Sequence, residues 1–458
     1  MSWKMRTQIG VLLNLIALCS WANADDLVPP VWDSVTPASY RLRVDDDRGR
    51  DAEPRRAEVP LEGRAPSGGA EAPRQDTEAS TESTGDEDGE SSTILGPMWH
   101  ELGPISFEYL YTNEVFNNAH GGLRTRGATR YRGNFDLTMR LDFERANLWS
   151  GGEVFVYMNN SHGRTLTGEF VGDGQCYSNI DTMPKPQDLT QLDEYWYRHH
   201  LNDDQLTLTI GKQDANADFG FADLGGDFVN ASFTGLPNVP MPFWPFQALG
   251  VTGLYQASED IRLGGGVFDH GRNENQWWVV TTNRGMFYLG QVDWQPLAEV
   301  ENSLMTIVRF GSWYTNSDTL AVDGQAVFEG NYGFYVTVDR SLIPEADDPD
   351  QGLAAFGQFS WAPPDRNQVD QHFAAGLVYR GLLPSRDIDT IGLGVTQIAF
   401  CKDQTELTGQ TNETAVEMFY KARFGERWAV EPDLQYIARP NGDGNDALVV
   451  GVRFEAAL

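Results

Sequence analysis

The end of the chain, residues 415–458, alternates between apolar and polar positions with a period of two. In residues 447–458 one face consists of Leu448, Val450, Val452, Phe454, Ala456 and Leu458. The opposite face carries Arg453 and Glu455 among small residues, and 428–439 and 416–424 alternate in the same way. Successive side chains of a β-strand point to opposite faces, so this stretch predicts three strands, each with an apolar face and a largely polar one.

The polar face of these three predicted strands is charged. A soluble β-sandwich would also produce alternation, but its inner face is dry. Here Lys421 and Arg423 lie on the first strand, Glu431 on the second and Arg453 on the third. Charges on one face of three neighbouring strands favour a barrel with a wet interior and lipid outside.

The same alternation recurs from Trp99 onward, with no long helical periodicity. We predict an all-β fold, a transmembrane antiparallel barrel of about sixteen strands. The expected strands are 105–112, 135–145, 154–159, 192–201, 205–213, 248–255, 261–268, 286–294, 302–310, 331–340, 354–361, 371–381, 389–399, 415–424, 428–436 and 447–454.

The predicted connections fall into two classes of length. Connections that leave odd-numbered strands are mostly long, as in 113–134, 160–191 and 214–247. Connections that leave even-numbered strands are mostly short, as in 202–204 and 425–427. Outer-membrane barrels have long external loops and short periplasmic turns, so this sorting supports the barrel over a sandwich.

The N-terminal part of the chain differs from the rest. Residues 1–24 have a charged start, an apolar core and an Ala22-Asn23-Ala24 site, which is typical of a secretory signal peptide. Residues 25–98 contain 18 acidic residues against 8 arginines and no lysine, a net charge of −10. This composition predicts a disordered acidic linker, either a solvated spacer or a tether. The barrel domain is expected to span 99–458.

Charge and motifs exclude several classes of function. The 458-residue chain has a formal net charge of −32, which argues against nucleic-acid binding. After residue 24 no apolar run reaches the roughly 18 residues of a membrane helix. We find no sequence motif of an enzyme, a metal site or a cofactor site, since His199 and His200 point to opposite faces of a strand and Gly264–Gly266 opens no helix. A hydrolase built into the barrel would still be compatible with the sequence, because catalytic groups need not be adjacent.

The predicted loop 214–247 is the longest one in the chain. Its 34 residues include seven aromatic side chains and no Lys or Arg. Exposing so many apolar rings to water is unfavourable, so we expect the loop to fold into the barrel. There its rings could bind sugars beside carboxylates, or they could simply pack the loop against the wall.

Several segments together resemble the carbohydrate-selective porins, the OprB-like family. They include Leu192–Tyr197, the Gly211-Lys212-Gln213-Asp214-Ala215 turn with Asp218-Phe219, 227–233, Val267-Phe268-Asp269 and Glu431–Ile437. The similarity covers roughly 99–458. The resemblance implies a sixteen-stranded outer-membrane barrel through which monosaccharides and related solutes diffuse, with charged and aromatic residues at the constriction. No cofactor is expected.

From the residues we predict a selective constriction inside the barrel. The loop would supply Asp214, Asp218, Asp223, Asp227 and Trp244. The polar strand faces would supply Arg140, Lys421, Arg423 and Arg453 on the opposite side of the pore. Opposed charges would leave little net barrier to a neutral solute. Alternatively, these charges only solvate a wide lumen.

Two cysteines remain after removal of the signal peptide. Cys176 and Cys401 lie in the second and seventh long connections, which are expected on the same side of the membrane. We hypothesise that they form a disulfide bond, provided that their Cα atoms approach within about 7 Å.

The expected function is passive diffusion of small neutral carbohydrates through the outer membrane. The expected partners are these sugars, outer-membrane lipid and the barrel-assembly machinery. One alternative is a general or cation-preferring diffusion pore, which the net acidity favours. A second is a structural envelope protein whose pore is incidental.

Overall fold

A computed structural model describes residues 101–181, 189–269, 285–296, 306–345, 348, 351–425 and 427–457. Its main elements are sixteen long strands. They are β2 (Ile105–His120), β3 (Thr129–Asp142), β4 (Gly152–Gly163), β5 (Leu189–Leu201), β6 (Leu206–Gln213), β7 (Ala248–Ser258), β8 (Ile261–Asp269), β9 (Met286–Trp294), β10 (Thr306–Leu320), β11 (Val327–Pro344), β12 (Gly352–Trp361), β13 (Val369–Arg380), β14 (Thr390–Phe400), β15 (Asn412–Phe424), β16 (Trp428–Ala438) and β17 (Ala447–Ala457).

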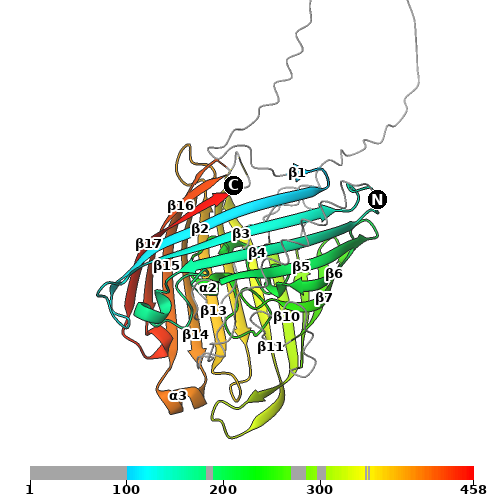
Figure 1. Ribbon diagram of the computed structural model, residues 1–458. Helices are drawn as coiled ribbons and strands as arrows, with labels where there is room; N and C mark the ends of the chain where they lie inside the picture. The colour runs from blue at the N-terminus through cyan, green and yellow to red at the C-terminus, as the bar shows by residue number, and fades with distance from the viewer. Residues whose placement is uncertain are drawn as a thin grey trace, which may run out of the picture. The chain divides into compact units, whose positions relative to one another are not determined.

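The sixteen strands form one closed sheet. Each pairs antiparallel with the next along the chain, and β17 closes the barrel by pairing with β2 from Leu448↔His120 to Ala457↔Leu110. The two-residue strand β1 (Glu101–Leu102) only adds to the start of β2. Figure 1 shows the strands inclined and side by side around the wall. The predicted fold class and strand number are confirmed.

The predicted strand boundaries agree with the observed ones for some strands and differ for others. The predicted strand 286–294 matches β9 at both ends. Several strands run further than predicted at the end that carries the long connections; for example, β2 and β10 continue to His120 and Leu320, and β3 and β11 begin at Thr129 and Val327. As a result the connections expected at 113–134 and 311–330 shrink to 121–128 and 321–326. The polar residues in these extensions are compatible with strands that rise beyond the lipid.

The helical segments are short and lie in the long connections. They are η3 (Thr167–Val171), η4 (Ala215–Ala217), η5 (Asp223–Gly225), α2 (Ala231–Thr234), α3 (Lys402–Thr408) and η7 (Pro440–Gly442). Among the described residues, no helix is long and apolar enough to cross a membrane.

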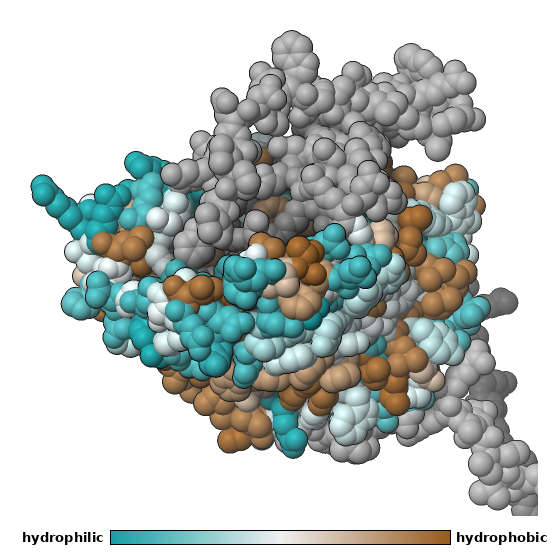
Figure 2. Space-filling model, turned by 90° about the horizontal axis from the view of Figure 1, so that it is seen from below, coloured by the Kyte–Doolittle hydropathy of each residue, from teal (hydrophilic) through white to brown (hydrophobic). Residues whose placement is uncertain are grey.

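The two faces of the wall have opposite chemistry, as the alternation predicts. On β17, Val452 is exposed on the outside, whereas Arg453 and Glu455 are buried on the inside. Large apolar side chains are exposed on the outer face of most strands, among them Ile210, Val251, Leu263, Phe310, Leu393 and Leu434. Figure 2, from below, shows hydrophobic residues gathered along the lower edge and the right flank of the molecule. Exposed apolar side chains on this scale suit contact with lipid.

Glycines on the inner face leave room for rings from neighbouring strands. A Cβ added to Gly311 on β10 would lie 2.0 Å from the Tyr335 ring. That ring is fully buried, and its hydroxyl donates to Gln291 Oε1 at 2.7 Å. Gln291 in turn accepts the N–H of Gly220, so the glycine helps to seat the loop after β6.

We predict that Gly311→Ala destabilises the folded barrel by about 1–3 kcal/mol, because the ring has no free space into which it can move. The measurement is urea unfolding of the detergent-solubilised protein followed by tryptophan fluorescence. Gly290→Ala is the matched control, since nothing lies within 4 Å of the Cβ that it would add. Equal midpoints for the two variants would contradict the proposed fit.

Candidate functional site

The connection 214–247 between β6 and β7 folds into the barrel and reaches the opposite wall. Asp339 on β11 accepts the backbone N–H groups of residues 223 and 224 at 3.0 and 2.9 Å. Glu417 on β15 accepts those of residues 229 and 230 at 2.6 and 2.9 Å. A carboxyl group can accept more than one hydrogen bond, so these two wall side chains fix the course of the loop across the lumen.

The aromatic side chains of this loop pack against the wall. Phe219 joins a buried cluster with Phe268, Phe287 and other inner-face residues of β8–β11. Phe228 and Phe233 form a second cluster with Phe356 and Phe419. These three loop rings are fully buried, so they hold the loop in place and offer no open face to a solute.

A second connection, 164–181, also folds inward, which the sequence reasoning missed. Glu413 on β15 accepts the N–H groups of residues 174 and 175 at 2.7 and 2.9 Å. The two inward segments contact each other through the backbone: the N–H of Asn179 donates to Val229 O at 2.9 Å, and that of Ala231 donates to Cys176 O at 3.1 Å. A signal was available in the sequence, because Phe170, Val171 and Tyr177 are apolar residues in a loop that we had assigned to the outside.

The loop aspartates pair directly with basic residues of the wall. Asp223 contacts Arg309 at 2.5 Å. Asp227 contacts Lys421 at 3.2 Å and Arg423 at 2.9 Å. The sequence analysis placed Lys421 and Arg423 across an open pore from the loop. In the structure they touch it, because the loop carboxylate lies against the same part of the wall.

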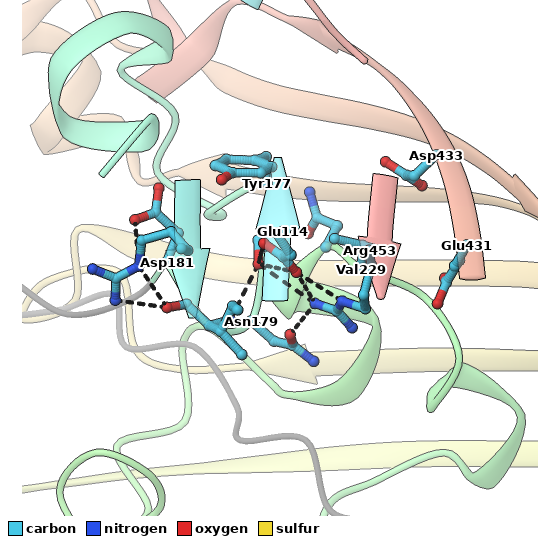
Figure 3. A network of polar contacts seen from close by, with 12 residues as sticks. Glu114, Tyr177, Asn179, Asp181, Val229, Glu431, Asp433 and Arg453 are labelled. Carbon is cyan, nitrogen blue, oxygen red and sulfur yellow. Dashed lines mark hydrogen bonds and ion pairs between the residues drawn. The ribbon is translucent and has the colours of Figure 1, made fainter. Parts of the chain in front are cut away.

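Arg453 occupies a closed polar network and does not face the loop carboxylates. Its Nε donates to Glu114 at 2.7 Å, and its guanidinium also contacts Asn179 (Figure 3). The side chain is completely buried. The charge of Arg453 therefore holds the segment 164–181 against β2 and β17, contrary to the expected arrangement.

Asp214 and Trp244 lie at the two ends of the inward loop. Asp214 accepts the N–H of Asn216 at 2.8 Å and that of Trp244 at 3.1 Å, and so joins the start of the loop to its end. The indole of Trp244 is buried, and its Nε1 has no hydrogen-bond partner among the described residues.

The expected disulfide bond is not present, because Cys176 and Cys401 are both free. Cys176 lies in the inward segment, where its carbonyl accepts the N–H of Ala231. Cys401 is the N-cap of α3, and its Sγ accepts the N–H of Gln404 at 3.4 Å. Because 164–181 turns into the barrel, Cys176 helps to join the two inward segments and does not lie in an external loop.

The inner face of β3–β5 carries charges that are partly exposed. Arg140 on β3 and Arg198 on β5 are 36% and 21% exposed, whereas Lys421 and Arg453 are 1% and 0% exposed. Glu153 on β4 lies between the two arginines, at 3.5 Å from Arg140 and 4.0 Å from Arg198. Arg198 also contacts Asp218 of the inward loop at 3.3 Å.

Two stacked rings support these arginines. Phe155 and Trp196 stack at a centroid distance of 4.7 Å. The guanidinium of Arg140 lies 4.8 Å from the Phe155 ring, and that of Arg198 lies 4.5 Å from the Trp196 ring. Guanidinium–ring stacking restricts the rotamers of a long side chain and leaves its N–H groups free to donate. We call the four charged residues Arg140, Glu153, Arg198 and Asp218, with the two rings, the charged strip.

The sequence analysis found only Arg140 and Asp218 of the charged strip. Glu153 and Phe155 share one face of the alternating segment 153–157, and Trp196 and Arg198 share one face of 194–198. The alternation could therefore have placed all four residues inside. It could not show that these charged side chains stay partly exposed.

A small polar space lies beside β3 and β4. Its volume is about 10 Å³, room for about one water molecule, and it is lined by Thr112, Asn134, Asp136, Tyr157, Asn179, Ile180 and Trp244. Asp136 accepts from Tyr157 at 2.5 Å and from Asn159 at 2.7 Å. Two buried donors, Asn179 Nδ2 and Trp244 Nε1, have no partner among the described residues. The space is therefore lined by an acceptor that already receives hydrogen bonds and by two donors without a partner among the described residues.

A closed sixteen-stranded barrel with an apolar outer face and a long loop folded into a charged lumen is the architecture of the outer-membrane porins, which are channels. Residues 126–458 match the profile of a family described as carbohydrate-selective porin, OprB family. The chain belongs to this family.

Individual relatives agree with this assignment. Porin B of Pseudomonas aeruginosa is 23% identical over 403 residues, which cover 77% of this chain and 87% of that protein. The putative porin QuiX of Acinetobacter baylyi is 21% identical over 384 residues, covering 74% and 86%. The high-pH structure of Pseudomonas putida OprB superposes with a TM-score of 0.70 at 23% identity and covers 78% of this chain and 94% of that one. The predicted family and its carbohydrate-selective class are confirmed.

We predict that Asp227 contributes to stability only when it is ionised. Burial disfavours its charge, but Lys421 and Arg423 outweigh burial and lower its pKa from 3.8 to about 2. Because the folded-state pKa is the lower one, the stabilisation is present above pH 4 and is lost as the pH falls towards 2. A shift of this size corresponds to about 2 kcal/mol.

The test compares the unfolding free energy of the protein with that of Asp227→Asn at pH 7 and pH 2. We expect a difference of about 2 kcal/mol at pH 7 that falls to less than a third of this value at pH 2. Asp323→Asn, on the exposed turn between β10 and β11, is the control. A difference that does not change with pH would contradict the role of the ion pairs.

Proposed function

We propose that the chain lets small neutral sugars diffuse passively along the charged strip on the inner face of β3–β5. The observation that carries this proposal is the arrangement of Arg140, Glu153, Arg198 and Asp218 on two stacked rings. These residues supply both donors and acceptors, and neither guanidinium is fully covered.

Balanced charges suit a neutral solute. The strip combines two guanidinium groups with two carboxylates, so its net charge is zero and it presents no ring of one sign to select ions. A sugar hydroxyl can accept from an arginine and donate to Glu153 or Asp218, which replaces the hydrogen bonds that the sugar loses to water. Because the rings hold the arginines in place, little side-chain entropy is lost when a solute binds.

The small space beside Trp244 has room for about one water molecule and not for a sugar, so the proposed path does not run through it. Trp244 was a candidate from the sequence, and its buried indole lines this space rather than the strip. Asp214, Asp223, Asp227, Lys421, Arg423 and Arg453 are better explained as groups that hold the loops in place.

The net acidity of the chain favours one alternative, a general or cation-preferring pore. Of the formal charge of −32, however, the segment 25–98 accounts for −10. Several lumen carboxylates are paired, as Asp227 is with Lys421 and Glu114 is with Arg453. Swelling of proteoliposomes in neutral sugars, amino acids and salts would separate the alternatives, and equal rates for all three would support the general pore. No swelling in any of them would support a structural envelope protein.

We further propose that the chain is exported through a signal peptide at 1–24, inserted by the barrel-assembly machinery and surrounded by outer-membrane lipid. Residues 1–100 lie outside the described part of the structure, and the proposal for the signal rests on the composition of 1–24 and its Ala22-Asn23-Ala24 site. N-terminal sequencing of the mature protein would test it, with Asp25 expected as the first residue.

We predict that Arg198→Ala lowers the glucose flux of reconstituted protein severalfold and weakens the preference for glucose over a salt. The variant removes donors from the strip and leaves Glu153 and Asp218 without their shared cation. Flux is measured by proteoliposome swelling, and ion preference by the reversal potential in a planar bilayer.

Arg366→Ala is the matched control for this prediction. Arg366 also stacks on a ring, at 3.7 Å from the centroid of Phe328, and also pairs with a carboxylate, Asp365, at 2.9 Å. It lies in the connection 362–368 and not on the wall of the lumen. If both variants change flux equally, the effect is one of folding and the strip is not the path.

A further inference from the structure

The outer face of β2–β5 carries two bands of aromatic and polar side chains with an apolar stretch between them. At the long-connection end, Tyr111, Tyr131 and His162 are joined: His162 Nε2 lies 3.2 Å from the Tyr111 hydroxyl and 3.4 Å from that of Tyr131. At the other end, Trp149 Nε1 donates to the Tyr197 hydroxyl at 2.9 Å. Tyr and Trp with polar tips mark the two surfaces of a membrane.

The spacing of the bands fits one bilayer. Tyr131 lies near the start of β3, and Phe143, whose ring centroid is 4.6 Å from that of Trp149, directly follows the last residue of β3, twelve positions further along the chain. Twelve residues at the rise of a strand span about 40 Å, and a tilt of about 45° reduces this to roughly 28 Å across the membrane. The outward residues between them, such as Leu137 and Met139, are apolar. Tyr131 therefore lies at the level of the lipid headgroups.

A basic patch lies directly beyond this level. The chain from Glu114 to Asp136 contains four arginines and no acidic residue between these two, in a protein with a net charge of −32. Arg124 and Arg164 are 58% and 66% exposed. Arg126 is also exposed, and the backbone N–H of Arg164 donates to the carbonyl of Tyr131 at 3.0 Å. We call Arg124, Arg126 and Arg164 the rim arginines.

The arginines at this rim are positioned by one carboxylate and one ring. Glu169 contacts Arg124 at 3.9 Å, Arg164 at 3.1 Å and Arg130 at 2.6 Å. Arg124 also lies 4.3 Å from the Phe170 ring. The hydrogen bonds from Arg130 keep the pKa of Glu169 below its usual value, so it carries a full negative charge. One carboxylate nevertheless cannot balance three guanidinium groups, and the excess positive charge faces the solvent.

We propose that the rim arginines bind the anionic headgroup of a membrane lipid at the long-connection end of the barrel. The chemistry required is a phosphate group next to an acyl chain. Guanidinium groups bind phosphate bidentately. The exposed Leu123 and Tyr131 supply apolar contact beside them. A soluble anion would also match the charge of the rim arginines, but it has no acyl chain to contact the apolar side chains beside the aromatic band.

The test measures how far lipid raises the unfolding temperature of the full-length protein in neutral detergent. Phosphatidylglycerol, phosphatidylcholine and inorganic phosphate are added separately to the protein and to Arg124→Gln/Arg164→Gln. We expect phosphatidylglycerol to raise the midpoint of the protein more than phosphatidylcholine does, and the variant to lose at least half of that extra shift. High salt should reduce the shift, because charges near the surface are screened.

Two further variants show whether a smaller temperature shift comes from the loss of charge at the rim arginines or from a general effect of substitution. Arg124→Lys/Arg164→Lys retains the charge and should keep most of the shift, whatever its own stability. Lys402→Gln/Arg439→Gln removes two exposed charges from another part of the same rim and should leave the shift unchanged. The proposal is overturned if this control loses as much as the test variant or if phosphatidylglycerol has no effect. It is also overturned if inorganic phosphate alone reproduces the shift, since the site would then bind small anions.

Discussion

The arrangement inside this barrel depends on wall carboxylates that accept consecutive backbone N–H groups from the loops. Asp339, Glu413 and Glu417 each hold two such groups. A loop in a lumen has many backbone groups that need partners, and an unsatisfied buried N–H is costly. A carboxylate can accept several hydrogen bonds, so one wall residue fixes both the position and the direction of the chain. The apolar clusters around Phe219 and Phe228 then fill the remaining space.

This way of holding the loops explains why most charges in the lumen have little contact with a solute. Lys421, Arg309 and Arg453 neutralise loop or wall carboxylates and are almost completely buried. Burying a charge without a partner is unfavourable, so each is matched by an acid close by. On β3–β5, in contrast to these three residues, Arg140 and Arg198 are partly exposed. The proposed path of the solute lies along this partly exposed surface.

The sequence predicted the strands of the barrel wall better than the contacts of the loops inside the barrel. The strands of the wall can be predicted locally, because successive side chains point alternately to the lipid and to the lumen. The strand 286–294 could therefore be placed without knowledge of the strands beside it. The extensions of β2 and β10 were missed because strands beyond the lipid lose the strict alternation. The rings of Phe219 and Phe228 correctly indicated that 214–247 turns inward.

The partners of the loops could not be predicted from the sequence. Residues joined by the carboxylate contacts are 116, 188 and 239 positions apart in the chain, and their meeting depends on the register of many strand pairs. For the same reason the sequence placed Arg423 across the pore from Asp227, although the two touch. It also placed Cys176 in an external loop, because the apolar residues Phe170, Val171 and Tyr177 are few in this long connection.

The two inward segments contact each other through backbone groups, from Asn179 to Val229 and from Ala231 to Cys176. Such contacts do not depend on which side chains the residues carry. Three of the carboxylates that hold the segments, Asp339, Glu413 and Glu417, lie on β11 and β15, whereas the charged strip lies mainly on β3–β5. Residues of the strip such as Arg140 and Glu153 can therefore be replaced, and under the proposed function the preferred solute changed, without removing these three supports. The same separation makes β3–β5 the natural place to redesign this barrel for another small molecule.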